Sequence, residues 1–239
     1  MVKFITAKEV PALIRDGDTL YTTGMMMAGL AEQALLEMEQ SFLATGHPRD
    51  LTFYTPVGQG NFKDKGMAHF AHEGMTRRVV AAHYGVGGPR LAEMVRNEQV
   101  EAYNWPQGVL AVMPRHVAGR RGGVFTKVGL GTFVDPRLEG GKINRRAQED
   151  LVEVRELDGE EFLYFKPPRV NVALIRGTTA DEHGNITLSR DGVLTDALTI
   201  AQAARACGGI VIAQVEDVAR AGTLHPKQIK VPGVLVDYV

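Results

Sequence analysis

The chain has 239 residues, enough for one large α/β domain or two small ones with a substantial buried core. Its composition is ordinary for a globular protein, with 44% hydrophobic and 23% charged residues, and its net charge of −1 gives no field that favours nucleic acid or an anionic membrane. Cys207 is the single cysteine, which excludes an internal disulfide and a cysteine-based zinc site. No run approaches the ~20 apolar residues of a membrane span, and the N-terminus lacks the apolar core of a signal peptide. We therefore expect a cytoplasmic protein that binds neither membrane nor nucleic acid.

The first elements follow a strand–loop–helix order. Thr6 and Glu9 have the spacing of a capping box and predict a short helix. Residues 19–23 are rich in β-formers and predict a strand, and residues 24–29 form a loop framed by glycines. Apolar residues at helical spacing then predict an amphipathic helix over 30–43.

This order repeats along the chain. Further strands are expected over 51–55, 78–82, 100–104, 170–175 and 209–215, and further helices over 89–97, from after the run 105–108 to about 118, and over 194–206. Such a succession predicts a mainly parallel sheet with helices on its faces, whose ligands bind at the carboxyl ends of the strands.

The order is interrupted between about 120 and 168. This stretch is rich in glycine and poor in helix formers, and Asp158-Gly159 separates two strand-like runs, which is a strong hairpin signal. We predict a small antiparallel flap inserted in an α/β domain that covers residues 1–239. The last residues, 231–239, form an apolar strand-like run, which we interpret as the edge of something larger.

Two loops are candidate sites. The loop Gly24–Gly29 lies between a strand and the start of a helix, and its backbone N–H groups can bind an anion or a developing oxyanion. The spacing is not that of a dinucleotide loop and there is no Walker lysine. The alternative is a tight turn whose three methionines pack into the core. Gln107, at a strand-to-helix bend, can orient a carboxylate, or can simply cap the next helix.

The histidines and acidic residues are less informative. His69 and His72 stand three residues apart, but their spacing does not match a zinc protease motif, and a structural hydrogen-bonding role is the better interpretation. No carboxylates are paired at a defined distance, and the run 178–185 is typical of side chains that satisfy a turn. No metal site is therefore expected.

Several runs resemble family I coenzyme A transferases, especially the single-chain acetate/propionate type. The runs that carry this resemblance cover most of the chain: 70–74 (FAHEG), 101–108 (EAYNWPQG), 129–137 (GLGTFVDPR), 173–179 (ALIRGTT), 200–203 (IAQA) and 223–227 (TLHPK). The resemblance implies the fold shared by CoA transferases and certain sugar-phosphate isomerases. It also implies that the chain is the α-type half of the enzyme.

The resemblance further implies a mechanism. Such enzymes attack an acyl-CoA with a glutamate and proceed through a glutamyl-CoA thioester, with coenzyme A as a substrate and no permanently bound cofactor. That glutamate belongs to a β-type half, which has no counterpart here, and Glu73, Glu182 and Glu216 do not match its motif. Gln107 matches the supporting glutamine of the α-type half. The implied partners are a β-type half, an acyl-CoA and a carboxylate, in an oligomer.

The glycine loop departs from the usual pattern of the family. The expected substrate-binding residues are Gly24, Met25, Met26, Gly29, Gly58 and Gly60. Three methionines follow Gly24 where the family has smaller or aromatic residues, and Pro56 stands near the place of an asparagine that donates to an oxyanion in related enzymes. Two alternatives therefore stay open: a drifted, non-catalytic binding or assembly module, and an acyl-CoA hydrolase on the same fold.

Overall fold

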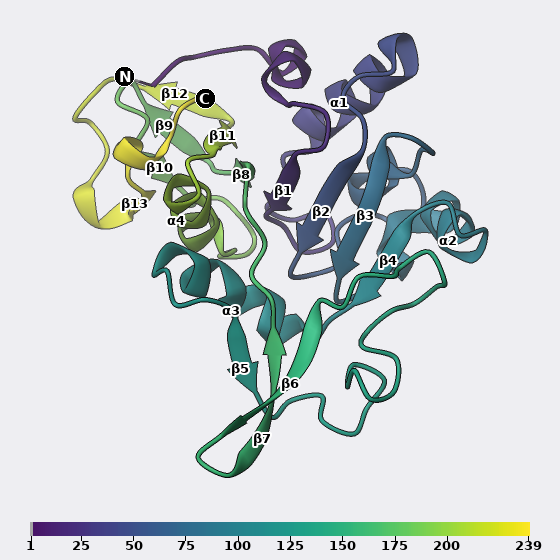
Figure 1. Ribbon diagram of the computed structural model, residues 1–239. Coiled ribbons are helices and arrows are strands. Elements are labelled where there is room, and N and C mark those ends of the chain that lie inside the picture. The colour runs from purple at the N-terminus through teal and green to yellow at the C-terminus, as the bar shows by residue number, and fades with distance from the viewer. Residues whose placement is uncertain (1) are drawn as a thin grey trace.

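A wholly parallel six-stranded sheet forms the centre of the protein (Figure 1). The structure is a computed structural model that describes residues 2–239. The strands lie in the order β11-β8-β1-β2-β3-β4. Their bounds are β1 (Thr19–Thr22), β2 (Leu51–Thr55), β3 (Thr76–Ala81), β4 (Glu101–Asn104), β8 (Val172–Arg176) and β11 (Ile210–Gln214). The predicted parallel sheet is confirmed.

The helices cover both faces of this sheet. They are α1 (Glu32–Thr45), α2 (Gly88–Arg96), α3 (Gln107–Ala118) and α4 (Ala197–Ala206), with short 3₁₀ turns such as η1 (Ala7–Leu13) and η2 (Gly66–Phe70). Residues that alternate along β1 and β2 point to opposite faces, because side chains in a strand alternate. Tyr21 and Tyr54 pack in the core under α3 and α4, whereas Leu20 and Phe53 pack in the core under α1.

Local signals explain where the first elements begin and end. The predicted capping box is present, since the Glu9 carboxylate accepts hydrogen bonds from the backbone N–H and hydroxyl of Thr6 at 2.8 and 2.9 Å. Helix α1 ends at Gly46, whose φ of 77° is left-handed and suits glycine at a helix end. None of the helices within residues 2–239 has the length and apolar character needed to cross a bilayer.

The predicted flap is confirmed. Strands β5 (Val124–Thr126), β6 (Val152–Leu157) and β7 (Glu160–Phe165) form an antiparallel sheet in the order β5-β7-β6. Asp158 and Gly159 both have positive φ, 52° and 78°, as the predicted two-residue hairpin requires. In Figure 1 the flap lies beyond the carboxyl ends of the parallel strands, on the side opposite to the two termini.

In the last third, one element was missed and one prediction is wrong. A second small sheet was not predicted; it has the order β12-β9-β10-β13, with β9 (Thr179–Asp181), β10 (Ile186–Thr187), β12 (Asp217–Ala219) and β13 (Ile229–Val231). The run 231–239 is not one strand: a 3₁₀ turn occupies Gly233–Leu235, and only Tyr238 makes isolated parallel bridges, to Lys3 and Ile212. Proline and glycine at 232 and 233 break the strand.

Candidate functional site

Three loops enclose a cavity of about 320 Å³ at the carboxyl ends of β1 and β2. They are the loop after β1, the loop after β2, and the segment that precedes α4; we call this space the loop cavity. Its lining consists of Thr23, Gly24, Met25, Pro56, Val57, Val193, Leu194, Thr195, Asp196 and Ile200. The loops therefore gather at the edge where parallel α/β sheets bind ligands.

The first loop is a tight turn that we call the methionine turn, residues 25–28. Met25 and Ala28 exchange two backbone hydrogen bonds of 2.9 Å, and Met26 at the tip has a left-handed φ of 54°. Met25, Met26 and Met27 are each 40–42% exposed. The alternative that these methionines fill the core is therefore wrong, because the turn projects their side chains away from the sheet.

The second loop holds the methionine turn in place. Met26 donates its backbone N–H to the Gly58 carbonyl and accepts from the Gly60 N–H, both at 2.9 Å. A Cβ on Gly60 would lie 2.4 Å from the Val86 carbonyl oxygen, and its φ is +139°. Gly58 and Gly60 thus support the methionine turn and are not among the residues that line the loop cavity. Their binding of substrate stays a prediction.

A buried amide that the sequence did not single out joins the two loops. Gln59 accepts a hydrogen bond from the Thr22 hydroxyl at 3.0 Å and donates to the Thr22 carbonyl oxygen at 3.3 Å. It is 1% exposed. No local signal marks this residue, since its role depends on a partner 37 positions away.

The third wall of the loop cavity is the segment just before helix α4. The predicted helix start at 194 is wrong, because α4 begins at Ala197 and leaves Thr195 and Asp196 in the wall. Asp196 is the N-cap, but its carboxylate makes no capping hydrogen bond. Burial raises the pKa of Asp196, and the Arg115 guanidinium opposes that rise only in part.

Gln107 lies apart from the loop cavity. It is the first residue of α3 and follows β4, which is two strands away from β2 in the sheet. Neighbouring strands are about 4.8 Å apart, so β2 and β4 are separated by roughly 10 Å. The Gln107 side chain is exposed, and its amide bonds no residue in the described part of the chain. Its supporting role stays a prediction.

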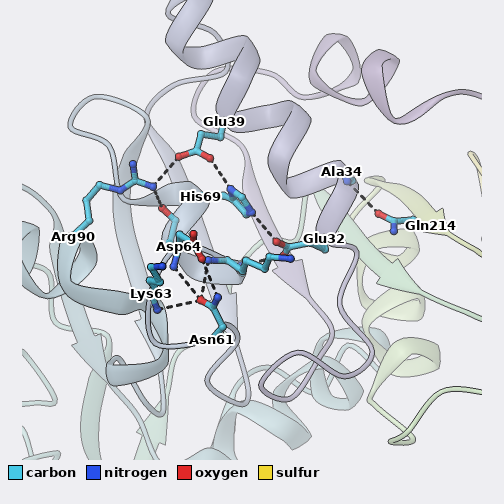
Figure 2. Close-up of polar contacts among 12 residues, drawn as sticks. Glu32, Ala34, Glu39, Asn61, Lys63, Asp64, His69, Arg90 and Gln214 are labelled. Atoms are coloured by element: carbon cyan, nitrogen blue, oxygen red, sulfur yellow. Dashed lines mark hydrogen bonds and ion pairs between the residues drawn. The ribbon is translucent and has the colours of Figure 1, made fainter.

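Behind the loops, acidic and basic side chains form a network between α1 and η2 (Figure 2). The His69 ring lies between two carboxylates of α1, with Nδ1 2.6 Å from Glu39 and Nε2 3.0 Å from Glu32. Glu39 also binds His72 at 2.6 Å and Arg90 at 2.8 Å. We call Glu32, Glu39, His69, His72 and Arg90 the ion-pair network.

The contacts of His69 define its charge. Both ring nitrogens face carboxylate oxygens, and both must donate, which makes the ring an imidazolium. Burial lowers the pKa of His69, but the hydrogen bonds to Glu32 and Glu39 raise it more, and the net direction is upward. Burial likewise raises the pKa of Glu39, while His69 and His72 lower it more.

The ion-pair network also anchors the second loop. The other carboxylate oxygen of Glu32 accepts a hydrogen bond from the Gly66 N–H at 3.0 Å, at the end of the segment that contains Gly58 and Gly60. The interpretation of His69 and His72 as structural hydrogen-bonding residues is confirmed. Within residues 2–239, no cluster of histidine, cysteine and acidic side chains suits a metal ion.

The other acidic residues singled out from the sequence are engaged elsewhere. Asp135 binds Arg137 and lies in a turn, and these contacts hold the pKa of its carboxyl well below the usual range. Asp181 accepts from the backbone of His183 and Asn185, as a turn-satisfying side chain does. Glu73, Glu182 and Glu216 bind Gln99, the Ala221 N–H, and two arginines, respectively. None of them lines the loop cavity.

A larger cavity, about 480 Å³, lies between the N-terminal segment, α1 and β11. Gln214 in its wall already accepts a hydrogen bond from the Ala34 N–H (Figure 2), and Glu216 is ion-paired with Arg176 and Arg190. The loop cavity is the better candidate, because its wall contains polar side chains that have no partner.

Comparisons with known proteins agree with this geometry. The family model described as coenzyme A transferase matches residues 4–239. All 239 residues of the chain align with the caffeate CoA-transferase of Acetobacterium woodii at 47% identity, and the aligned region covers 45% of that relative. It superposes on the acyl-CoA transferase YdiF of Escherichia coli O157:H7, solved as a thioester complex with CoA, with a TM-score of 0.96 and 37% identity, and covers 46% of that chain.

The relatives differ in how they divide the sequence. The chain spans about half the length of the first two relatives. It also matches the acetate CoA-transferase subunit alpha of Escherichia coli K12 at 28% identity, where 99% of the chain covers 96% of that subunit. The corresponding region is thus half of a longer chain in some relatives and a separate subunit in another. The chain belongs to the coenzyme A transferase family.

Proposed function

We propose that the chain is the α-type half of a CoA transferase that moves coenzyme A from an acyl-CoA to a carboxylate, and that a β-type half supplies the nucleophilic glutamate. The observation that carries this proposal is a loop cavity at the carboxyl edge of the sheet whose lining contains no glutamate. Asp196 is its one carboxylate. A half-site of this kind needs a second half to perform covalent catalysis.

The proposed reaction consists of balanced exchanges. The partner's glutamate attacks the thioester carbonyl, and the CoA thiolate leaves behind an acyl-glutamyl anhydride. The thiolate then attacks the glutamyl carbonyl, which releases the first carboxylate and forms a glutamyl-CoA thioester. The acceptor carboxylate reverses the two steps, so the glutamate is regenerated and a new acyl-CoA leaves.

Each step passes through an oxyanion that needs a hydrogen-bond donor. Gly24 lines the loop cavity, and its N–H bonds no backbone carbonyl within residues 2–239. We assign this N–H as an oxyanion donor. Gln107, with its unpartnered amide at the same edge of the sheet, is assigned to orient the partner's glutamate.

The rim of the loop cavity supports a partner at this face. Leu194 is 75% exposed and Met25 of the methionine turn is 42% exposed, and both line the loop cavity. Apolar side chains gathered around a pocket mark interaction surfaces. The β-type half is proposed to cover them, within an oligomer, in the cytoplasm. The relatives are named for caffeate and for acetate.

The experiment compares the chain alone with the chain joined to a β-type half. Chromatography of acyl-CoA products should show no transfer to acetate by the chain alone and transfer by the combination. Gln107→Ala should lower kcat of the combination by about 100-fold, as misplacement of a reacting group does. Transfer by the chain alone would refute the need for a β-type half. Release of free CoA without a new acyl-CoA would indicate a hydrolase, and no turnover at all a binding module.

A further inference from the structure

Two polar side chains that have no partner among residues 2–239 line the loop cavity, and they belong to adjacent residues. The Thr23 hydroxyl is already used, since it donates to the Gly29 carbonyl at 3.0 Å and accepts from the Arg176 N–H at 3.1 Å. The Thr195 hydroxyl and the Asp196 carboxylate make no hydrogen bond or ion pair with any residue the structure describes. These two side chains are therefore available to a ligand.

The position of Asp196 makes its free carboxylate unusual. An aspartate at a helix N-cap normally accepts hydrogen bonds from the first N–H groups of the helix. Asp196 contributes only its backbone carbonyl, which accepts from the Ile200 N–H at 2.9 Å. Its carboxylate lines the loop cavity instead. Burial there raises its pKa.

The rest of the cavity lining contributes no cation to this carboxylate, and the Arg115 guanidinium that acts on it is not part of the lining. Most other lining side chains are apolar, and no lysine, arginine or histidine is among them. An acyl chain that ends in a second carboxylate would place a negative charge near Asp196 in a partly buried site, which is unfavourable. A hydroxyl at the same point would donate a hydrogen bond to a charged acceptor, which is stronger than a neutral one.

The size of the cavity also bears on the acyl group. Its volume of about 320 Å³ is at the lower end of small-molecule pockets. An acetyl group has three non-hydrogen atoms and would leave most of this space to water. The loop cavity therefore suits a longer acyl chain, whose far end reaches the polar corner.

We infer that Asp196 selects the acyl group by its far end: it binds chains that carry a hydroxyl there and rejects chains that end in a second carboxylate. This inference rests on the proposed function and adds the substrate class. It assigns Asp196 to recognition and leaves the nucleophile to the β-type half.

The test uses the complete enzyme, the chain with its β-type half, and three CoA donors with acetate as the common acceptor. The donors are 4-hydroxybutyryl-CoA, pentanoyl-CoA and succinyl-CoA, which end in a hydroxyl, a methyl and a carboxylate. We expect kcat/KM to fall in that order. Asp196→Asn should narrow the ratio of hydroxybutyryl to succinyl by about tenfold or more, and Asp196→Leu should abolish the preference for hydroxybutyryl over pentanoyl.

The control is Asp50→Asn, the same change on an exposed aspartate outside the cavity, where a φ of 56° suits asparagine. Its ratios should equal those of the wild type. If an Asp196 variant does not fold, Thr195→Val should weaken the same hydroxyl preference. Ratios that stay unchanged in the folded variants overturn the inference, and so does loss of all turnover in folded Asp196→Asn. Absence of transfer by the wild type with every donor would instead overturn the proposed function.

Discussion

The loop cavity and the ion-pair network each contain acidic side chains, but they differ in whether those side chains have hydrogen-bond partners within the chain. In the ion-pair network, the Glu39 carboxylate binds three side chains and both nitrogens of His69 are bonded. In the loop cavity, Thr195 and Asp196 bond no described residue. The side chains of the network stabilise the fold, whereas Thr195 and Asp196, which are partly exposed, are free to bind a ligand as proposed above.

The comparison is tested most strongly at Glu39. Glu39→Gln removes the carboxylate that binds His69, His72 and Arg90, and leaves the buried His69 ring with Glu32 as its one carboxylate partner among residues 2–239. We expect the free energy of unfolding in urea to fall by about 3–5 kcal/mol. The matched control is Glu37→Gln on the same helix, whose carboxylate accepts a hydrogen bond only from Gln33 and should change stability by less than about 0.5 kcal/mol. Equal effects of the two changes would contradict the contrast.

A second test separates a glycine that the fold requires from one that it does not. Gly60→Ala forces a Cβ to within 2.4 Å of the Val86 carbonyl oxygen at a φ of +139°, and should cost about 1–3 kcal/mol or more. Gly108→Ala, in α3, meets nothing within 4 Å and should raise stability by roughly 0.5–1 kcal/mol. Thermal unfolding of the two variants should therefore shift in opposite directions, and a shared direction would refute the assigned packing.

The pH dependence of stability should follow the ion-pair network. The pKa of His69 is raised above its ordinary 6.5, so its contribution is complete below that value and is lost as pH rises through the folded-state pKa. The pKa of Glu39 is lowered from 4.5, so its contribution is lost as pH falls through the folded-state value. Urea unfolding at about pH 6 should thus show more stability than at about pH 9. His69→Gln should flatten that difference, and an unchanged slope would argue against the imidazolium.

The smallest effect on stability is expected at the methionine turn. Met26 has a φ of 54°, which asparagine adopts more readily than methionine. Met26→Asn should therefore leave the free energy of unfolding unchanged or raise it by less than about 1 kcal/mol, as measured by thermal unfolding. CoA transfer by the complete enzyme should nevertheless decrease, since the change removes an exposed apolar side chain from the surface that the β-type half is proposed to cover. A clear drop in stability would place Met26 in the folding core after all.

The parallel sheet and its loops were predictable because their signals are local. Apolar strand runs such as 51–55 and the glycines that follow them need no distant partner to be recognised, and the hairpin at Asp158-Gly159 is encoded in two residues. The second small sheet was missed because β10 has two residues and β9 has three, too few for an alternating pattern.

The partners within the site were not predictable in the same way. His69 and Glu39 are 30 positions apart, and only the fold brings them together. One weak signal existed: Glu32 and Glu39 are seven residues apart, and thus on the same face of a helix. Asp196 was not singled out because the predicted helix began at 194 and included it. Even a correct helix start would have suggested only an ordinary N-cap role for this aspartate.

The position of β1 at the middle of the sheet has a consequence for the order of folding during synthesis. Leu20 pairs with Phe53 on one side but with Val172 on the other, and the Thr19 N–H binds the Asn171 side chain 152 positions away. At ~5–20 residues per second, β8 leaves the ribosome several seconds after β2. Until then β1 presents an open apolar edge of the kind that recruits other chains. We expect nascent chains stalled before residue 172 to depend on chaperones, and those stalled well beyond residue 176 to be released from that need.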